Sequence, residues 1–215
     1  MTTKNLFIDL ETTGLDYDRC AVVEISGTIE YAQVYEEFSF KSCPFDGAII
    51  TDESLEKIGY TEDELWNFPP IDETYRNLIQ VFSKHIERYD KFDKFTTYVY
   101  GPEFDNTFLR QFFALNSDQY FGSWFWNPWI DVMSLAMKYL AEKRYLMENF
   151  KLVTVAEFLG IEVNRGKLHS SLYDVELTKK INNMVEDKSI LENAKTPEII
   201  HEETVKRKSK YCVYE

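Results

Sequence analysis

Residues 6–15 read Leu6-Phe7-Ile8-Asp9-Leu10-Glu11-Thr12-Thr13-Gly14-Leu15. An apolar run that ends in a Thr-Thr-Gly turn is typical of a buried β-strand and the turn that follows it. Side chains alternate between the two faces of a strand, so Asp9 and Glu11 share one face. The apolar Leu6, Ile8 and Leu10 take the other face. Two carboxylates therefore project together from the end of a buried strand.

Neighbouring carboxylates need a counter-charge when they are removed from water. Unpaired, they repel each other and resist desolvation. Divalent cations remove both penalties, and Mg²⁺ prefers carboxylate oxygens while it keeps positions open for water and phosphate. The alternative is an edge strand whose acidic face is simply solvated, because an isolated Asp-x-Glu occurs by chance in many chains.

The composition limits the class of protein. A chain of 215 residues with 44% hydrophobic content is suited to one large domain, or to a domain with a tail. Its net charge of −13 argues against a broadly basic nucleic-acid-binding surface. It does not exclude a nucleic-acid enzyme whose acidic centre is neutralised by metal. Three widely spaced cysteines favour a reducing, cytoplasmic location, and the sequence predicts no membrane span.

The rest of the chain alternates between strand and helix patterns. We expect strands at 22–29, 34–40 and 95–100, the last parallel to the first strand, with the helix before it as the crossover. We expect helices at 52–58, 71–88 and 103–115, and at 132–144 with Asp131 as its cap. A shorter helix capped by Thr154 would end at Gly160, and the segment 166–174 would open a last strong helix.

Two of these helices carry an aspartate on an apolar face. Asp105 lies three and four residues before apolar positions of its helix, and Asp174 lies three residues before Leu177. A charge on a buried face needs a partner, although a favourable N-terminal charge would also explain Asp105 alone. His169 precedes the last helix, on a loop that contains Gly166. The other two histidines, at 85 and 201, fit ordinary exposed positions.

The segment 120–129 is dense in aromatic residues. Such a cluster either stacks unpaired bases or belongs to the core or to an oligomer contact. Beyond residue 187 the periodicity fades, and basic residues gather at 206–210. We therefore expect one domain over 1–187 and a C-terminal extension or tail over 188–215.

Three motifs taken together resemble the DEDDh family of 3′–5′ exonucleases, which includes the proofreading subunit of bacterial replicative polymerase and RNase T. The resemblance covers roughly residues 5–186. The motifs are Phe7-Ile8-Asp9-Leu10-Glu11-Thr12-Thr13-Gly14-Leu15, Tyr100-Gly101-Pro102-Glu103-Phe104-Asp105-Asn106-Thr107-Phe108-Leu109 and Leu168-His169-Ser170-Ser171-Leu172-Tyr173-Asp174-Val175-Glu176-Leu177-Thr178.

The chain departs from the family pattern in two places. Many members have His-Asn where this chain has Tyr100-Gly101, and Arg-Ala where it has Ser170-Ser171. Neither change touches a proposed metal ligand, but both leave the substrate preference open. The sister group places a Tyr one position after the His, and Ser170 at that position assigns this chain to the His group.

The resemblance implies an α/β fold of the RNase H-like type. Its mixed five-stranded sheet would have three antiparallel strands and then two parallel ones, flanked by helices. Asp9, Glu11 and Asp174 would hold one of two Mg²⁺ (or Mn²⁺) ions, and Asp9 would bridge to the second. Asp105 would reach that second ion through water, and His169 would act as general base.

The resemblance also implies a substrate, which is nucleic acid with a free 3′ end. Thr12, Thr13 and Gly14 would offer backbone contacts to the terminal 3′-hydroxyl, and Leu15 would wedge against the last base. The sequence predicts hydrolysis of single-stranded DNA to nucleoside 5′-monophosphates. An exoribonuclease or short-oligonucleotide nuclease is one alternative, and an inactive nucleic-acid-binding module is another. Whether the chain acts alone, as a homodimer or beside a polymerase stays open.

Overall fold

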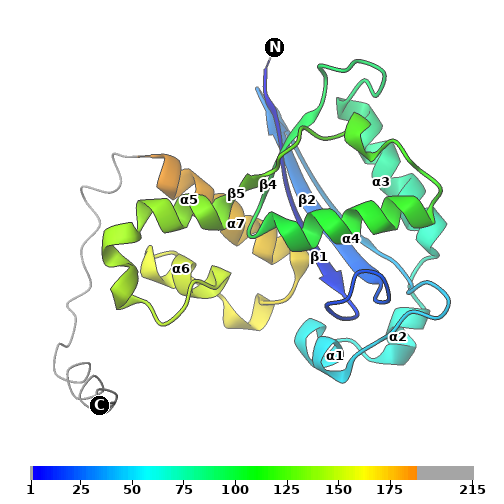
Figure 1. The fold of residues 1–215 in the computed structure, drawn as a ribbon, viewed down its shortest axis with the longest axis horizontal. Coiled ribbons are helices and arrows are strands. Elements are labelled where there is room, and N and C mark those ends of the chain that lie inside the picture. The colour runs from blue at the N-terminus through cyan, green and yellow to red at the C-terminus, as the bar shows by residue number, and fades with distance from the viewer. Residues whose placement is uncertain (1, 188–215) are drawn as a thin grey trace, which may run out of the picture.

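A five-stranded mixed sheet forms the centre of the molecule. The computed structural model describes residues 2–187, and the predicted C-terminal extension, 188–215, lies outside them, as does His201. The strand order is β3-β2-β1-β4-β5 (Figure 1). Strands β1 (Lys4–Thr12), β2 (Val22–Tyr31) and β3 (Val34–Lys41) are antiparallel, whereas β4 (Phe95–Val99) is parallel to β1 and β5 (Ile130–Asp131) is parallel to β4. The predicted RNase H-like sheet is confirmed.

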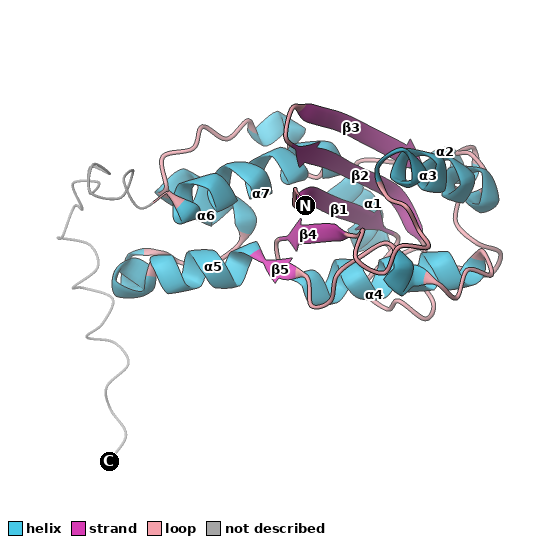
Figure 2. Ribbon diagram, turned by 90° about the horizontal axis from the view of Figure 1, so that it is seen from above, coloured by secondary structure: helices cyan, strands magenta, loops and turns pink. Residues whose placement is uncertain are grey.

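Helices cover both faces of this sheet (Figure 2). The described α-helices are α1 (Asp52–Ile58), α2 (Glu62–Trp66), α3 (Ile71–His85), α4 (Pro102–Leu115), α5 (Val132–Tyr139), α6 (Leu152–Phe158) and α7 (Ser171–Glu186). Leu6, Ile8 and Leu10 pack with α3 and α4 in one apolar cluster. Phe7 packs with α5, α6 and α7 in a second cluster on the opposite face, where it stacks on Tyr98 at 4.6 Å. The alternation predicted for the first strand is therefore confirmed.

Three helix boundaries differ from the prediction. Helix α3 ends at His85, because Ile86 turns to an extended backbone. Helix α5, capped by the Asp131 side chain as predicted, ends at Tyr139 and is followed by a 3₁₀ helix at Ala141–Leu146. Helix α6 begins at Leu152, so Thr154 is not its cap, and the Thr154 hydroxyl instead donates to Asn149 Oδ1 at 2.7 Å.

The aromatic segment is mainly part of the core. Phe121, Trp124, Phe125 and Trp129 belong to the cluster that also contains α3 and α4, and none is more than 7% exposed. They therefore do not form an external platform for bases. Of the two predicted roles, the structure supports burial, because these rings fill the space between α3, α4 and the start of β4.

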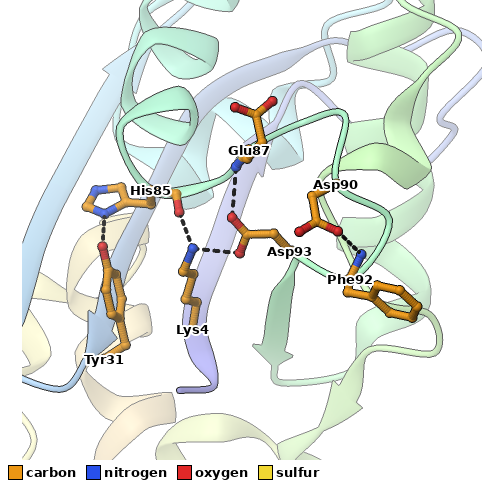
Figure 3. A network of polar contacts seen from close by, with 7 residues as sticks. All are labelled: Lys4, Tyr31, His85, Glu87, Asp90, Phe92 and Asp93. Atoms are coloured by element: carbon orange, nitrogen blue, oxygen red, sulfur yellow. Dashed lines mark hydrogen bonds and ion pairs between the residues drawn. The ribbon is translucent and has the colours of Figure 1, made fainter. Parts of the chain in front are cut away.

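His85 is buried, contrary to the prediction of an exposed position. Figure 3 shows its contacts with Tyr31 and Lys4. Its Nδ1 lies 3.1 Å from the Tyr31 hydroxyl and its Nε2 lies 2.8 Å from Glu36 Oε2. Lys4 donates to the His85 carbonyl and to Asp93 Oδ1, each at 2.5 Å. This polar network ties the start of β1 to the end of α3 and the loop before β4. None of the described helices has both the length and the apolar character needed to cross a bilayer.

Candidate active site

Asp9 and Glu11 come from the last part of β1. Asp9 is opposite Ser26 of β2, and Glu11 is opposite Glu24, with a register shift between Glu11 and Thr12. Glu11 is only 4% exposed, whereas Asp9 is partly exposed. Both carboxylates therefore stand on the face of the sheet that α7 covers, as the strand periodicity predicts.

Asp105 is brought to the same place by the first turn of α4. The Gly101 backbone has φ +87°, a conformation that favours glycine, and Pro102 then starts the helix. Asp105 is buried, and its Oδ1 accepts a hydrogen bond from the backbone N–H of Leu10 at 3.2 Å. The bond connects α4 to β1 between Asp9 and Glu11, so the predicted buried position of Asp105 is confirmed.

Helix α7 and the loop before it complete the cluster. Asp174 lies in the first turn of α7, and its Oδ1 is buried with no hydrogen-bond partner among the described residues. His169 has a left-handed backbone, φ +64°, which is unusual for a residue other than glycine. Glu11, His169 and Asp174 each offer one ligand atom, and these atoms lie within 4.8 Å of one another. The topology thus brings all five predicted residues to one end of β1.

The carboxylates strongly disfavour their charged forms. Burial, reinforced by Asp105, Glu11 and Asp174, raises the pKa of Asp9 well above its usual value. Burial is also the main cause that raises the pKa of Glu11 to about 8, of Asp105 to about 7 and of Asp174 to about 6. Groups of this kind are typical of functional sites and of sites for a bound cation.

His169 has the opposite tendency. Burial, together with the positive charge of Lys57, lowers the pKa of its imidazole. A lowered pKa favours the neutral ring at pH 7, and only the neutral ring can accept a proton. The site therefore combines an imidazole whose neutral form is favoured with a set of carboxylate oxygens.

Two adjoining hollows lie beside the site, and Glu11 lines the first of them. A cavity of about 80 Å³ lies between the end of β1 and α1, and its lining includes Glu11, Thr12, Leu15 and Lys57. A larger groove of about 630 Å³ runs along the start of α4 and shares Leu15 and Phe104 with the cavity. Leu15 is 83% exposed, so it stands free at the junction of the two hollows.

A sequence profile of the RNase T exonuclease family matches residues 6–182. The chain belongs to this exonuclease family. The match takes in all three motifs, and the resemblance stated from them is confirmed at the level of the family. No curated protein matches the chain in sequence.

Solved structures of exonucleases share the fold. E. coli exonuclease I in complex with a dT13 oligonucleotide has a TM-score of 0.66 at 16% identity, over 89% of this chain and 43% of that chain. A 3′-exonuclease, in a structure of its 3′-end specific recognition of the histone mRNA stem-loop, also has a TM-score of 0.66 at 16% identity, over 87% of this chain and 65% of that one. This chain therefore spans less than half the length of exonuclease I.

The Thr-Thr-Gly turn of this exonuclease domain has a mainly structural second residue. Thr13 is fully buried, its N–H donates to Ala21, and its carbonyl accepts from Thr51 and Ser54. Thr13 does not line the cavity, and its contact with substrate stays a prediction. A Cβ at Gly14 would lie 2.6 Å from Cys20 Sγ, so this tight turn requires glycine.

Sequence reasoning missed two polar groups beside the site. Glu24 is 5% exposed, and its Oε1 accepts a hydrogen bond from Ser171 Oγ at 2.5 Å. An acid inside the apolar run Val22–Ile29 was the available signal. Lys57 lines the cavity from α1, and no pattern in the sequence distinguishes it from other exposed lysines of a short helix.

Proposed function

We propose that this chain is a divalent-metal-dependent 3′–5′ exonuclease that releases nucleoside 5′-monophosphates from the 3′ ends of nucleic acids. One observation carries the proposal. Asp174 Oδ1 is buried and unpaired beside Glu11 and His169, in a cluster that α7 completes from the far end of the chain. A buried, unpaired carboxylate oxygen is costly unless a ligand satisfies it.

The donor set fits hard divalent cations. Asp9, Glu11, Asp105 and Asp174 would hold two Mg²⁺ or Mn²⁺ ions through carboxylate oxygens. When bound, such ions supply positive charge that makes a bound water more acidic and stabilises the charge that develops on the phosphate. The raised pKa values of Asp9 and Glu11 also favour a bound cation, because a cation removes the mutual repulsion of the charged carboxylates.

The protein's own groups would then accept the proton and bind the 3′ end of the strand. His169, neutral because its pKa is lowered, accepts the proton of the attacking water. The water oxygen bonds to phosphorus, and the 3′-oxygen of the penultimate nucleotide leaves. The backbone of Thr12 and Gly14 would face the terminal sugar, and exposed Leu15 would pack against the last base.

We infer single-stranded DNA as the preferred substrate and RNA as the next. The support is the groove beside the site, which is lined by the exposed Leu15 and Tyr17 and by Phe104. Such an apolar and aromatic lining suits splayed, unpaired bases. Very short oligonucleotides are the second candidate, because a net charge of −13 leaves little surface for tracking a long phosphate backbone.

A degradation time course tests both proposals. Matched 5′-labelled single-stranded DNA, duplex DNA and RNA are incubated with Mg²⁺, and with EDTA as the metal-free control. We expect a ladder that shortens from the 3′ end, fastest on single-stranded DNA. Activity that does not depend on the metal, or a stepwise loss from the 5′ end, would contradict the proposal. A strong preference for di- to pentanucleotides would select the second candidate.

A further inference from the structure

Lys57 is the cation that the fold places beside the carboxylate cluster. Helix α1 lies beyond the C-terminal end of β1 (Figure 1). Lys57 stands in the last turn of this helix and lines the cavity together with Glu11 and Thr12. Its ammonium acts electrostatically on all five site residues, including the carboxylates of Asp9 and Glu11.

The position of α1 is fixed by the same turn that carries the motif. The carbonyl of Thr13 accepts hydrogen bonds from the backbone N–H of Thr51 at 2.9 Å and from Ser54 Oγ at 2.7 Å. The Thr13 hydroxyl donates to the Ile49 carbonyl at 2.6 Å. Because these bonds join the start of α1 directly to the end of β1, the backbone at Lys57 is held in a defined place relative to Glu11.

The ammonium group of Lys57 has no protein partner within residues 2–187. Within residues 2–187 its Nζ makes no hydrogen bond, and no carboxylate lies within 4.0 Å of it, although the cluster is close enough to feel its charge. Lys4 and Lys179, in contrast, are each paired with an acid. Lys57 and Glu11 both line the cavity of about 80 Å³, which leaves room for a small anionic group beside them.

We propose that Lys57 binds a non-bridging oxygen of the scissile phosphodiester. This inference rests on the proposed function. Two divalent cations would balance the four ligand carboxylates, so the negative charge of the entering phosphate would remain unmatched. Lys57 supplies that match from α1, and its positive charge also stabilises the extra negative charge that develops during hydrolysis.

Replacement of Lys57 tests the contact. Lys57→Gln removes the charge, Lys57→Arg keeps it, and Lys91→Gln is the matched control. Lys91 is exposed in the loop before β4, at the other end of β1. We expect Lys57→Gln to lower kcat/KM on single-stranded DNA by roughly 10- to 100-fold at saturating Mg²⁺. The slope of log kcat/KM against log salt should become shallower by about 0.7, the value of one phosphate contact to a single strand.

A second readout needs no turnover. Fluorescence anisotropy of the same labelled oligonucleotide in Ca²⁺ should show weaker binding to Lys57→Gln, with Lys57→Arg close to wild type and Lys91→Gln unchanged. Wild type that binds the oligonucleotide but does not hydrolyse it in Mg²⁺ would contradict the proposed function, whereas weaker binding by Lys57→Gln in Ca²⁺ would still support a contact between Lys57 and a phosphate. The inference is overturned if Lys57→Gln matches Lys91→Gln in slope and anisotropy. It is also overturned if Lys57→Gln alters only the Mg²⁺ concentration for half-maximal rate, because Lys57 would then act on the ligands alone.

Discussion

Ser171 Oγ donates a hydrogen bond to Glu24 Oε1 at 2.5 Å, and this contact joins the first turn of α7 to β2 directly opposite Glu11. Ser171 Oγ also lies 2.6 Å from Ser26 Oγ, and all three groups are buried. Asp174 follows Ser171 by three residues on the same helix. The contact therefore helps to set the distance between Asp174 on α7 and Glu11 on β1.

Ser171→Ala should destabilise the protein and lower its kcat. The change leaves the buried Glu24 carboxylate without its short hydrogen bond, at a cost of about 1–3 kcal/mol in the free energy of unfolding. Glu24→Gln keeps an acceptor for Ser171 and should cost less. Urea unfolding and kcat of the variants check this. A Ser171→Ala protein as stable as wild type would show that the hydrogen bond is not a significant tie.

Asp174→Asn and Asp9→Asn should each abolish turnover without unfolding the protein. Both changes remove a proposed metal ligand and also relieve the repulsion within the cluster, so the metal-free variants should melt no lower than wild type. Mg²⁺ should raise the melting temperature of wild type and have little effect on the variants. The control is Asp63→Asn, which changes an exposed acid of α2. Wild-type rates in either ligand variant would refute the metal site.

The metal-free protein should lose stability as the pH rises. Folding raises the pKa of Asp174 to about 6, of Asp105 to about 7 and of Glu11 to about 8, against about 4 in an unfolded chain. The folded state therefore binds more protons between these values, and the stability that these groups contribute below about pH 4 is lost as the pH rises through about 6 to 8.

Melts in EDTA at a series of pH values measure this loss. The difference in melting temperature between wild type and Asp174→Asn separates the effect of the carboxylate cluster from that of the other acids of the chain. As the pH rises, the melting temperature of wild type should fall relative to that of Asp174→Asn. Mg²⁺ should stabilise wild type most at high pH, where it does not compete with protons for the carboxylates. A difference that does not vary with pH would contradict the prediction.

His169→Ala should lower kcat by roughly 10²- to 10⁴-fold, the usual contribution of a positioned base. Because the pKa of His169 is lowered, the wild-type rate should rise with pH along a limb below the usual imidazole value of about 6.5 and then level. The variant should lose that limb and keep its Mg²⁺ affinity, which calorimetry measures.

The geometry makes this test informative, because a ring nitrogen of His169 lies within 4.8 Å of a carboxylate oxygen of Glu11 and of Asp174, which is close enough for the three to share one ion. A variant that loses Mg²⁺ binding as completely as Asp174→Asn would make His169 a ligand. A variant that keeps both the rate and the acidic limb would reduce it to a loop residue.

Local patterns in the sequence determined the strand face that Asp9 and Glu11 share and the buried helix faces of Asp105 and Asp174. These follow from periods of two and of 3.6 residues, which any chain of this pattern must obey. The three motifs, in their order, then pointed to the exonuclease family that the profile confirms.

Only the tertiary structure decided which residues distant in the sequence lie side by side. Glu24 meets Ser171 over a separation of 147 residues, and Lys57 comes to the carboxylates because α1 is bonded to the Thr13 carbonyl. The rings of Phe121, Trp124, Phe125 and Trp129 and the imidazole of His85 are buried because other elements pack over them. Burial and long-range pairing depend on which surfaces meet after the chain closes on itself, and a local pattern does not contain that information.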